Sequence, residues 1–338
     1  MATQSVAVSP HGWQFEVKDG ETVLDAALRQ GVAIKYGCRH GNCSTCKYLV
    51  EDGEVDFGAA SPYSLPERER AEGYALLCCA QPLTDLDIVD DSEVDDRQRE
   101  ILPIIETVGS VHTVSRLSED LWELCIELPE PLTFYAGQFV ELEVPGRAGH
   151  WRSYSIASPP TDATRLSFVV KRIEGGAFSD QVASLKPGTG IHLRGPYGTS
   201  YVRDGDRSVV LVATGSGIAH VLSILQNAAD EGDHRSFTFY YGARTRADLV
   251  KVDLLEELKD KIELRVVDAL SQPTSECQWN EKPGRVTQSI QADLSDASEL
   301  DAYLCGKPEM CDTIGTLLEA KGTRSSRIFF DKFYAASP

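Results

Sequence analysis

The sequence predicts three domains of different fold class: a small α+β domain, an antiparallel β-barrel and a doubly wound parallel sheet. The first rests on a hairpin, one short helix and a cysteine-rich loop within residues 1–95. The second rests on short alternating strands between Pro- and Gly-rich turns over residues 102–203, and the third on apolar strands alternating with helical stretches over residues 204–338. A length of 338 residues suits two or three hydrophobic cores.

The pattern of turns and apolar residues in the first domain predicts a small sheet with one helix. Ser5–Val8 and Trp13–Val17 are expected to pair as a hairpin, and apolar residues then recur at helical spacing over Val23–Leu28. A later strand is expected at Leu86–Val89. The acidic stretch after it lacks apolar periodicity, so residues 96–101 are expected to form a linker.

Four cysteines of this domain have the plant-type ligand spacing for a [2Fe–2S] cluster. Three form a C-x4-C-x2-C run and the last follows a gap of 31 residues: Cys38, Cys43, Cys46 and Cys78. Three thiolates from one loop can surround a cluster only if the backbone bends sharply, and Gly37 and Gly41 are expected to allow that bend. Backbone N–H groups of the loop are expected to point at the sulfurs.

Other readings of these cysteines fit less well. A zinc site would need Cys78 and Cys79 as a second knuckle, and adjacent cysteines are a poor one. A Rieske centre needs two histidines, and the loop has only His40. Some cysteines outside the ligand set are expected to be small buried hydrophobes: Cys79, Cys125, Cys277 and Cys311.

The second domain is expected to be a barrel, because five short strands follow one another: Leu121–Leu128, Gln138–Val144, Ser153–Ile156, Leu166–Arg172 and Gly190–Arg194. The tetrapeptide Arg152-Ser153-Tyr154-Ser155 lies at the start of one of them. A flavin needs a cation for its phosphates, a flat ring against its own and a hydrogen-bond partner, which Arg152, Tyr154 and Ser155 can supply in turn. Alone, such a tetrapeptide is more often an ordinary edge strand.

A second glycine motif follows in the same domain. Gly175 and Gly176 precede a helix expected at Asp180–Leu185, with Ser179 at its start. Glycines there let backbone N–H groups reach a pyrophosphate, and the Ser179 hydroxyl can add a contact. A simple N-cap by Ser179 is the alternative.

The third domain is expected to hold a pyridine nucleotide. Its strands are expected at Val209–Ala213, Ser236–Tyr241, Ile262–Val267 and Ala302–Cys305. After the first strand, Gly215-Ser216-Gly217 allows a dinucleotide to approach a helix N-terminus, although a lone G-x-G is weak evidence. Arg244 follows the second strand, and no cluster of cations for a 2′-phosphate accompanies it, so NADH is favoured over NADPH.

Across its whole length the chain resembles the reductase components of bacterial multicomponent oxygenases. These join a plant-type ferredoxin domain of β-grasp fold to a module like ferredoxin–NADP reductase. The resemblance implies FAD and NADH as cofactors, Cys78 as fourth ligand after Tyr74–Leu77, and catalytic roles for Ser155 and Cys305. It further implies cofactor contacts from Ser153, Val170, Lys171, Gly306 and, as a cover for the flavin ring, Phe333. The chain departs from the usual pattern at His220, where relatives have Pro.

The implied electron path runs from NADH to FAD, then to the cluster, and then to an oxygenase or hydroxylase component. The Gly37–Cys43 and Ser61–Leu65 segments look most like reductases of soluble di-iron alkane or alkene monooxygenases. Three other functions stay open: reductase of a Rieske-type dioxygenase, an iron–sulfur flavoenzyme that reduces a small substrate, and a non-enzymatic redox sensor.

The formal net charge of −19 argues against binding nucleic acid or anionic lipid. Residues 1–95 hold 17 Asp and Glu against 7 Lys and Arg, a net charge of −10. An acidic face there would either dock on a basic partner or only maintain solubility. The apolar Ser208–Leu225 region is interrupted by polar residues, and Met1–Trp13 lacks a secretory pattern. A cytoplasmic protein, monomeric when alone, is therefore expected.

Overall fold

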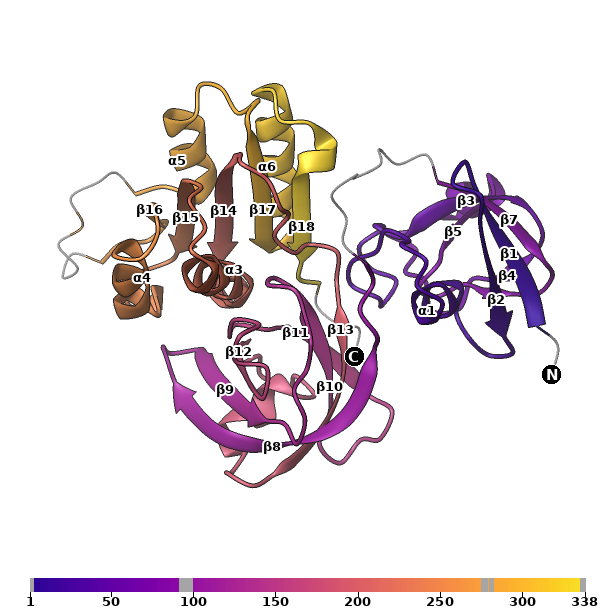
Figure 1. Ribbon diagram of the computed structural model, residues 1–338, viewed down its shortest axis with the longest axis horizontal. Coiled ribbons are helices and arrows are strands. Elements are labelled where there is room, and N and C mark those ends of the chain that lie inside the picture. Colours follow the sequence, from indigo (N-terminus) through magenta and orange to yellow (C-terminus); the bar gives the residue numbers. More distant parts are fainter. Residues whose placement is uncertain (1–2, 91–99, 275–278, 280–282, 335–338) are drawn as a thin grey trace. The chain divides into compact units, whose positions relative to one another are not determined.

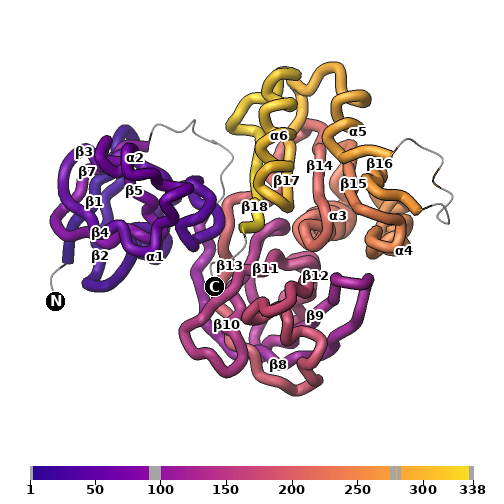
Figure 2. The backbone as a smooth tube through the Cα atoms, turned by 180° about the vertical axis from the view of Figure 1, so that it is seen from behind, coloured from indigo at the N-terminus to yellow at the C-terminus, as the bar shows by residue number. Residues whose placement is uncertain are grey.

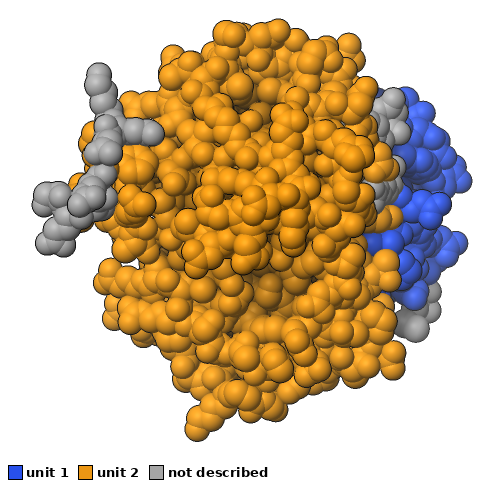
Figure 3. Space-filling model, turned by 60° about the vertical axis from the view of Figure 1, so that its left-hand side comes forward, with its two compact units in different colours: residues 1–104, 332–338 blue, residues 105–331 orange. Residues whose placement is uncertain are grey.

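The computed structural model describes residues 3–90, 100–274, 279 and 283–334 (Figure 1). The chain forms two compact units, residues 1–104 with 332–338, and residues 105–331, which Figure 3 shows in different colours. Among the described residues, no helix combines the length and the apolar character that crossing a membrane requires.

The first unit is built on a five-stranded mixed sheet in the order β2-β1-β7-β3-β5. Its strands are β1 Thr3–Ser9, β2 Trp13–Lys18, β3 Lys47–Asp52, β5 Tyr74–Leu76 and β7 Leu86–Val89. β1 pairs antiparallel with β2 and parallel with β7. Helix α1 (Val23–Arg29) begins at Thr22, whose Oγ1 accepts a hydrogen bond of 3.1 Å from the Asp25 N–H. The smaller elements are α2 Glu67–Ala71, β4 Val55–Asp56 and β6 Gln81–Pro82. This is the β-grasp arrangement that was expected.

The second unit begins with six antiparallel strands in the order β11-β10-β13-β8-β9-β12. They are β8 Ile105–Arg116, β9 Leu121–Glu127, β10 Phe139–Glu143, β11 Trp151–Ser155, β12 Arg165–Lys171 and β13 Gly190–Tyr197. A bridge between Ile156 and Phe168 joins the two ends of this sheet, so the barrel is nearly closed. The segment expected as a helix at Asp180–Leu185 is a short 3₁₀ helix, η1 Ser179–Ser184.

The same unit continues as a five-stranded sheet in the order β16-β15-β14-β17-β18. The strands are β14 Ser208–Thr214, β15 Phe237–Ala243, β16 Leu264–Leu270, β17 Leu300–Gly306 and β18 Ile328–Lys332. The helices are α3 Ile218–Glu231, α4 Val252–Lys259, α5 Val286–Asp293 and α6 Pro308–Ala320, with 3₁₀ turns η2 Gly215–Gly217, η3 Arg246–Asp248 and η5 Ser325–Arg327. Strands β14 to β17 run parallel.

Successive side chains of β14 pack alternately into two hydrophobic cores, one on each face of the sheet. Leu211 packs with α3 and α4, and Val212 packs with α5 and α6 (Figures 1 and 2). One sheet with helices on both faces is the doubly wound arrangement that was expected. His220, in the first turn of α3, does not prevent the helix from starting directly after Gly217.

The barrel and the nucleotide sheet touch through side chains of α3. Ser223 Oγ donates to the Ser158 carbonyl at 2.9 Å, and Gln226 Nε2 donates to the Ala157 carbonyl at 2.8 Å. These contacts fix the end of β11 beside the carboxyl ends of the parallel strands, where ligands of such sheets bind.

Candidate functional site

The cysteine loop, residues 37–46, contains three residues with positive φ. Gly41 has φ +71°, as the sequence predicts, but the other two are not glycines: Arg39 has φ 61° and Ser44 has φ 58°. Gly37 contributes space instead of a bend. A Cβ at Gly37 would lie 3.1 Å from Cys43 Sγ, so a side chain there would crowd the sulfur.

Backbone donors of this loop point at its sulfurs, as expected. The N–H of Cys38 donates to Cys43 Sγ at 3.3 Å, and the N–H groups of His40 and Asn42 donate to Cys38 Sγ at 3.4 Å. Hydrogen bonds from the Cys46 and Cys79 thiols hold the pKa of Cys78 well below its usual range. Iron needs deprotonated sulfur, and N–H donors stabilise it. This donor set fits a [2Fe–2S] cluster.

The choice between Cys78 and Cys79 as fourth ligand stays a prediction. Their sulfurs lie 3.7 Å apart, and Cys78 is buried while Cys79 is half-buried. The expectation that Cys79 is a buried hydrophobe is wrong, because Cys79 is half-buried and its sulfur contacts that of Cys78. Cys125 and Cys311 are buried as expected, and Cys277 lies outside the described residues.

The predicted flavin strand is β11. Along a strand alternate residues share a face, so Arg152 and Tyr154 lie on one face and Ser153 and Ser155 on the other. The Tyr154 ring lies 5.1 Å from that of Phe178, and burial raises the pKa of Tyr154. The neutral ring therefore offers an aromatic surface fixed by packing.

The two other predicted contact residues of the barrel lie at the end of β12. Val170 is fully buried within the barrel core. Lys171 is half-exposed and forms an ion pair of 3.1 Å with Asp120. Their contact with a flavin stays a prediction.

The glycine motif before η1 forms a compact turn. Gly175 has φ +72°, and its N–H donates to Asp180 Oδ2 at 3.1 Å. A Cβ at Gly176 would lie 2.4 Å from Ser179 Oγ and 2.9 Å from the Ile173 carbonyl oxygen, so a side chain there would force the turn to shift. The Ser179 hydroxyl lies 3.4 Å from the Ile173 N–H, whose hydrogen bond it accepts, and does not cap a helix.

The nucleotide turn packs directly on the strand that carries Cys305. Gly215 has φ +57°, with Ser216 next in the turn, and a Cβ at Gly217 would lie 2.6 Å from the Cys305 carbonyl oxygen. Gly306 has φ +140°. The glycines therefore bring the turn and the carboxyl end of β17 into contact.

Arg244 follows β15 and is paired with carboxylates. Its guanidinium lies 3.3 Å from Asp120 and 3.5 Å from Asp248. A 2′-phosphate would have to displace both acids, which agrees with NADH as the donor. Phe333 follows β18 and is half-buried; its contact with a flavin stays a prediction.

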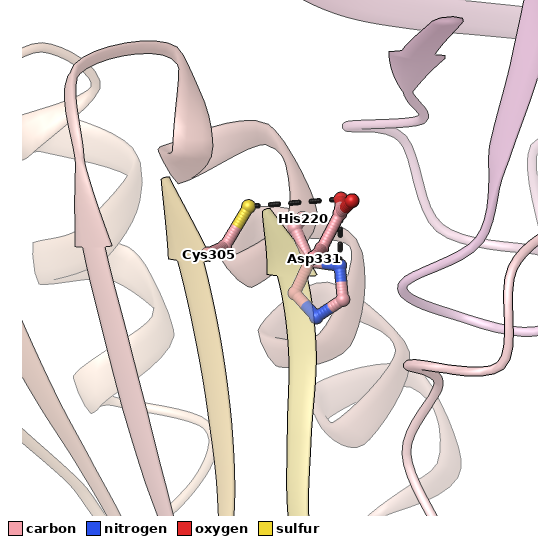
Figure 4. Close-up of side chains that lie close together, drawn as sticks. All are labelled: His220, Cys305 and Asp331. Atoms are coloured by element: carbon pink, nitrogen blue, oxygen red, sulfur yellow. Dashed lines mark hydrogen bonds and ion pairs between the residues drawn. The ribbon is translucent and has the colours of Figure 1, made fainter. Parts of the chain in front are cut away.

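Ser155 and Cys305, from two different domains, meet at one atom that the sequence did not single out. Ser155 Oγ donates to Asp331 Oδ2 at 2.7 Å. Cys305 Sγ donates to the same oxygen at 3.7 Å (Figure 4). Burial, and then the nearby Asp331, raise the pKa of the Cys305 thiol, which stays protonated. His220 Nδ1 lies 3.6 Å from this oxygen.

This arrangement can move a proton. The Asp331 side chain is 16% exposed, so its carboxylate joins the buried Ser155 hydroxyl to solvent. Asp331 stands between Phe330 and Phe333, in a segment where the sequence singled out only Phe333. Its acidic side chain within an apolar run was the one signal that could have identified it.

Three family models match successive parts of the chain. They describe a 2Fe-2S iron-sulfur cluster binding domain at residues 6–83, an oxidoreductase FAD-binding domain at residues 109–201, and an oxidoreductase NAD-binding domain at residues 211–315. The prediction of a [2Fe–2S] cluster, FAD and NADH as cofactors is confirmed.

Similar proteins extend over the whole chain. The reductase component DmpP of phenol 2-monooxygenase from Pseudomonas sp. (strain CF600) is 38% identical, covering 98% of this chain and 95% of that protein. The reductase component of propane 2-monooxygenase from Gordonia sp. (strain TY-5) is 33% identical, covering 98% of this chain and 97% of that protein. The crystal structure of Amycolatopsis cytochrome P450 reductase GcoB matches with a TM-score of 0.87 at 31% identity, covering 99% of this chain and 100% of that one.

Proposed function

Because the chain belongs to the family of iron–sulfur flavoprotein reductase components of multicomponent oxygenases, we propose that its acceptor is the hydroxylase component of a soluble di-iron monooxygenase. The chain passes electrons from NADH through FAD and a [2Fe–2S] cluster to its oxygenase component. The relatives named for phenol and propane monooxygenases support the choice of acceptor.

The observation that carries the function is the presence of three cofactor-binding regions on one chain. Bound FAD accepts a hydride and a [2Fe–2S] cluster carries single electrons, so together they let one two-electron donor serve a one-electron acceptor.

We infer that Ser155 and Asp331 would handle the proton that a reduced flavin gives up when its second electron leaves for the cluster, since hydride transfer from NADH itself releases no proton. Ser155 Oγ holds a proton that it donates to Asp331 Oδ2 at 2.7 Å. The partly exposed carboxylate can pass that proton to water. Cys305 contributes a neutral thiol at the end of β17, where it would position the nicotinamide without acting as a nucleophile.

We propose three sets of cofactor contacts. The cluster ligands are Cys38, Cys43, Cys46 and Cys78. The flavin contacts are Arg152, Ser153, Tyr154, Ser155, Val170, Lys171, Gly175, Gly176, Ser179 and Phe333, and the nicotinamide contacts are Gly215, Ser216, Gly217, Arg244, Cys305 and Gly306. The N–H donors on the loop sulfurs and the positive φ of Gly175 and Gly215 support these roles.

We propose domain boundaries at residues 1–95, 102–203 and 204–338, with a linker at 96–101. The family matches at 6–83, 109–201 and 211–315 fall within these limits. Residues 91–99 lie outside the described part of the chain, so the structure does not fix the linker. We propose a cytoplasmic location, which the free cysteines of the described residues support, and a monomeric state without the partner.

Reconstitution tests the acceptor. The purified holoprotein, NADH and a di-iron hydroxylase with its organic substrate should give product at a rate that rises with the concentration of the chain. A Rieske oxygenase and a cytochrome P450 serve as competing acceptors under the same conditions. Turnover with either of these and none with the di-iron hydroxylase would overturn the proposed acceptor.

A cytochrome P450 is the second candidate acceptor, because the match to the P450 reductase GcoB covers the whole chain. The two other functions left open by the sequence, a redox sensor and a flavoenzyme that reduces a small substrate, are tested separately. Steady NADH-dependent reduction of cytochrome c would exclude a pure redox sensor, and NADH oxidation driven by a small organic substrate alone would favour a self-sufficient reductase.

A further inference from the structure

Three side chains of metal-ligand type converge at the carboxyl end of the nucleotide sheet. His220 Nδ1 comes from α3, Cys305 Sγ from β17 and an Asp331 oxygen from β18, and these atoms all lie within 4.8 Å of one another (Figure 4). Ser155 and Asp331 suffice for the proton transfer inferred above, and that reaction needs no imidazole.

The His220 ring is fully buried, and its Nδ1 has no hydrogen-bond partner among the described residues. This nitrogen points at Asp331 Oδ2 from 3.6 Å, which is too far for a hydrogen bond. The other ring nitrogen, Nε2, lies 3.5 Å from Ser200 Oγ. With the proton on Nε2, the Nδ1 lone pair faces the carboxylate. A buried polar atom left in this way is costly and calls for a ligand.

We propose that His220, Cys305 and Asp331 form a binding site for Zn²⁺, and that Zn²⁺ bound there blocks hydride transfer from NADH. Sulfur and imidazole ligands select Zn²⁺ over Mg²⁺ or Ca²⁺. Tetrahedral Zn²⁺ with bonds of about 2.0–2.3 Å holds its ligand atoms roughly 3.3–3.5 Å apart. The sulfur–oxygen and nitrogen–oxygen distances of 3.7 and 3.6 Å are close to those values.

Charge and proton balance are met. One Zn²⁺ displaces one proton from the Cys305 thiol to solvent and bonds the resulting thiolate, the Asp331 carboxylate and the neutral His220 imidazole. The complex has no net charge, which a buried site requires. Water fills the fourth position from the exposed side of Asp331, as in open zinc sites.

Inhibition follows from the shared atom. Asp331 Oδ2 accepts the proton of Ser155, and Cys305 lies against the glycine turn. A metal on Cys305 and Asp331 occupies the place of the nicotinamide and so blocks hydride transfer, and it also removes the proton acceptor that reoxidation of the flavin needs. This second half of the proposal rests on the proposed function, whereas metal binding itself does not.

Equilibrium dialysis of the holoprotein against micromolar Zn²⁺ tests the binding, with zinc, iron and flavin measured on the same sample. Anaerobic stopped-flow measurement of flavin reduction by NADH, with and without Zn²⁺, tests the inhibition. The decisive variant is His220→Gln, with His220→Ala as a second, since neither changes Ser155, Cys305 or Asp331. His192→Gln is the matched control, because His192 is half-exposed and lies 4.0 Å from a carboxylate of Glu143.

We expect one Zn²⁺ per chain with iron fully retained, and flavin reduction slowed at least tenfold. Both His220 variants should bind Zn²⁺ at least tenfold more weakly and keep their rate in its presence, while His192→Gln behaves as wild type. Unchanged zinc affinity in both His220 variants, or zinc uptake that matches iron loss, would overturn the site. Zinc bound at His220 without slower flavin reduction would overturn the inhibition alone. Absence of NADH-dependent flavin reduction in zinc-free protein would instead contradict the proposed function.

Discussion

Asp331 Oδ2 accepts from the Ser155 hydroxyl and the Cys305 thiol, two groups from different domains. Residue 331 is 176 positions from Ser155 and 26 from Cys305, so only the folded chain brings these atoms together. A hydroxyl whose proton is held by a carboxylate is oriented before any ligand binds.

Replacing Asp331 by Asn should therefore slow electron transfer from the reduced flavin to the cluster by roughly 10²-fold, because the acceptor for the proton released in that step is lost while the size is kept. Anaerobic stopped-flow spectroscopy at saturating NADH measures this rate. FAD content should stay unchanged, and Asp331→Glu should recover part of the rate. A full rate in the Asn variant would show that Asp331 carries no proton.

The second residue-scale prediction concerns the fourth cluster ligand. Cys78→Ser should abolish the visible absorption of the cluster, while Cys79→Ala should keep iron and sulfide at wild-type content. Cys78 is buried and lies two residues after the end of β5, whereas Cys79 is half-buried. Loss of the cluster in the Cys79 variant with retention in the Cys78 variant would reverse the assignment.

At the scale of elements, alternation located most strands of the second unit, and two strands of that unit, β8 and β18, were missed for physical reasons. In β8 the apolar residues recur at every third position, and not at every second as in a half-buried strand: Ile105, Val108, Val111 and Val114. The strand is mostly exposed and has a bulge near Thr113, so its sequence does not show the alternation that predicts a strand. β18 contains adjacent phenylalanines followed by Asp331, which is a packing pattern without alternation. The missed strand carried the missed site residue.

More of the cluster loop than of the flavin site in the barrel could be predicted from the sequence. Cysteine spacing identifies ligands directly, since sulfur is scarce and the motif is local. The positive φ of Arg39 and Ser44 could not be predicted, because both residues ordinarily avoid that region. The helix expected after Gly176 is only a 3₁₀ turn, because Gly175 and Ser179 close the segment on itself.

The η2 turn offers a prediction at this scale. Gly217→Ala places a Cβ 2.6 Å from the Cys305 carbonyl oxygen, so the turn must shift. We expect weaker NADH binding and a loss of about 1–3 kcal/mol in the free energy of unfolding. Urea unfolding and NADH titration of flavin reduction measure the two effects.

Gly232→Ala is the matched control for that variant. Gly232 ends α3 with φ +64° and has open space around it. Alanine there should cost about 1 kcal/mol of stability without changing NADH binding. Equal NADH affinity in both variants would mean that the contact between the turn and β17 does not shape the nicotinamide site.

At the scale of the whole molecule, charge is unevenly distributed. The chain carries −19, and residues 1–95 account for −10. A negative field on the cluster-bearing unit would speed encounter with a basic acceptor and would be screened by salt over about 10 Å at 0.1 M.

Electron delivery to the oxygenase component should therefore slow about tenfold between low and high salt, while the limiting rate of flavin reduction at saturating NADH stays constant. Neutralising three exposed acids of the first unit should reduce this salt dependence: Glu51, Asp52 and Glu54. Neutralising three exposed acids of the second unit should leave the salt dependence unchanged: Asp253, Glu257 and Asp260. If the rate of electron delivery does not change with salt concentration, the acidic residues do not steer docking and serve only solubility.

The central claim is that one polypeptide carries electrons from NADH through a bound flavin to a bound iron–sulfur cluster. Anaerobic titration of the purified chain with NADH, followed by visible spectroscopy after iron, sulfide and flavin analysis, tests it most directly. We expect about two iron and two sulfide per FAD, and loss of both the flavin and the cluster absorption as NADH is added. A flavin that is reduced while the cluster stays oxidised, or a chain that holds no iron, would contradict it.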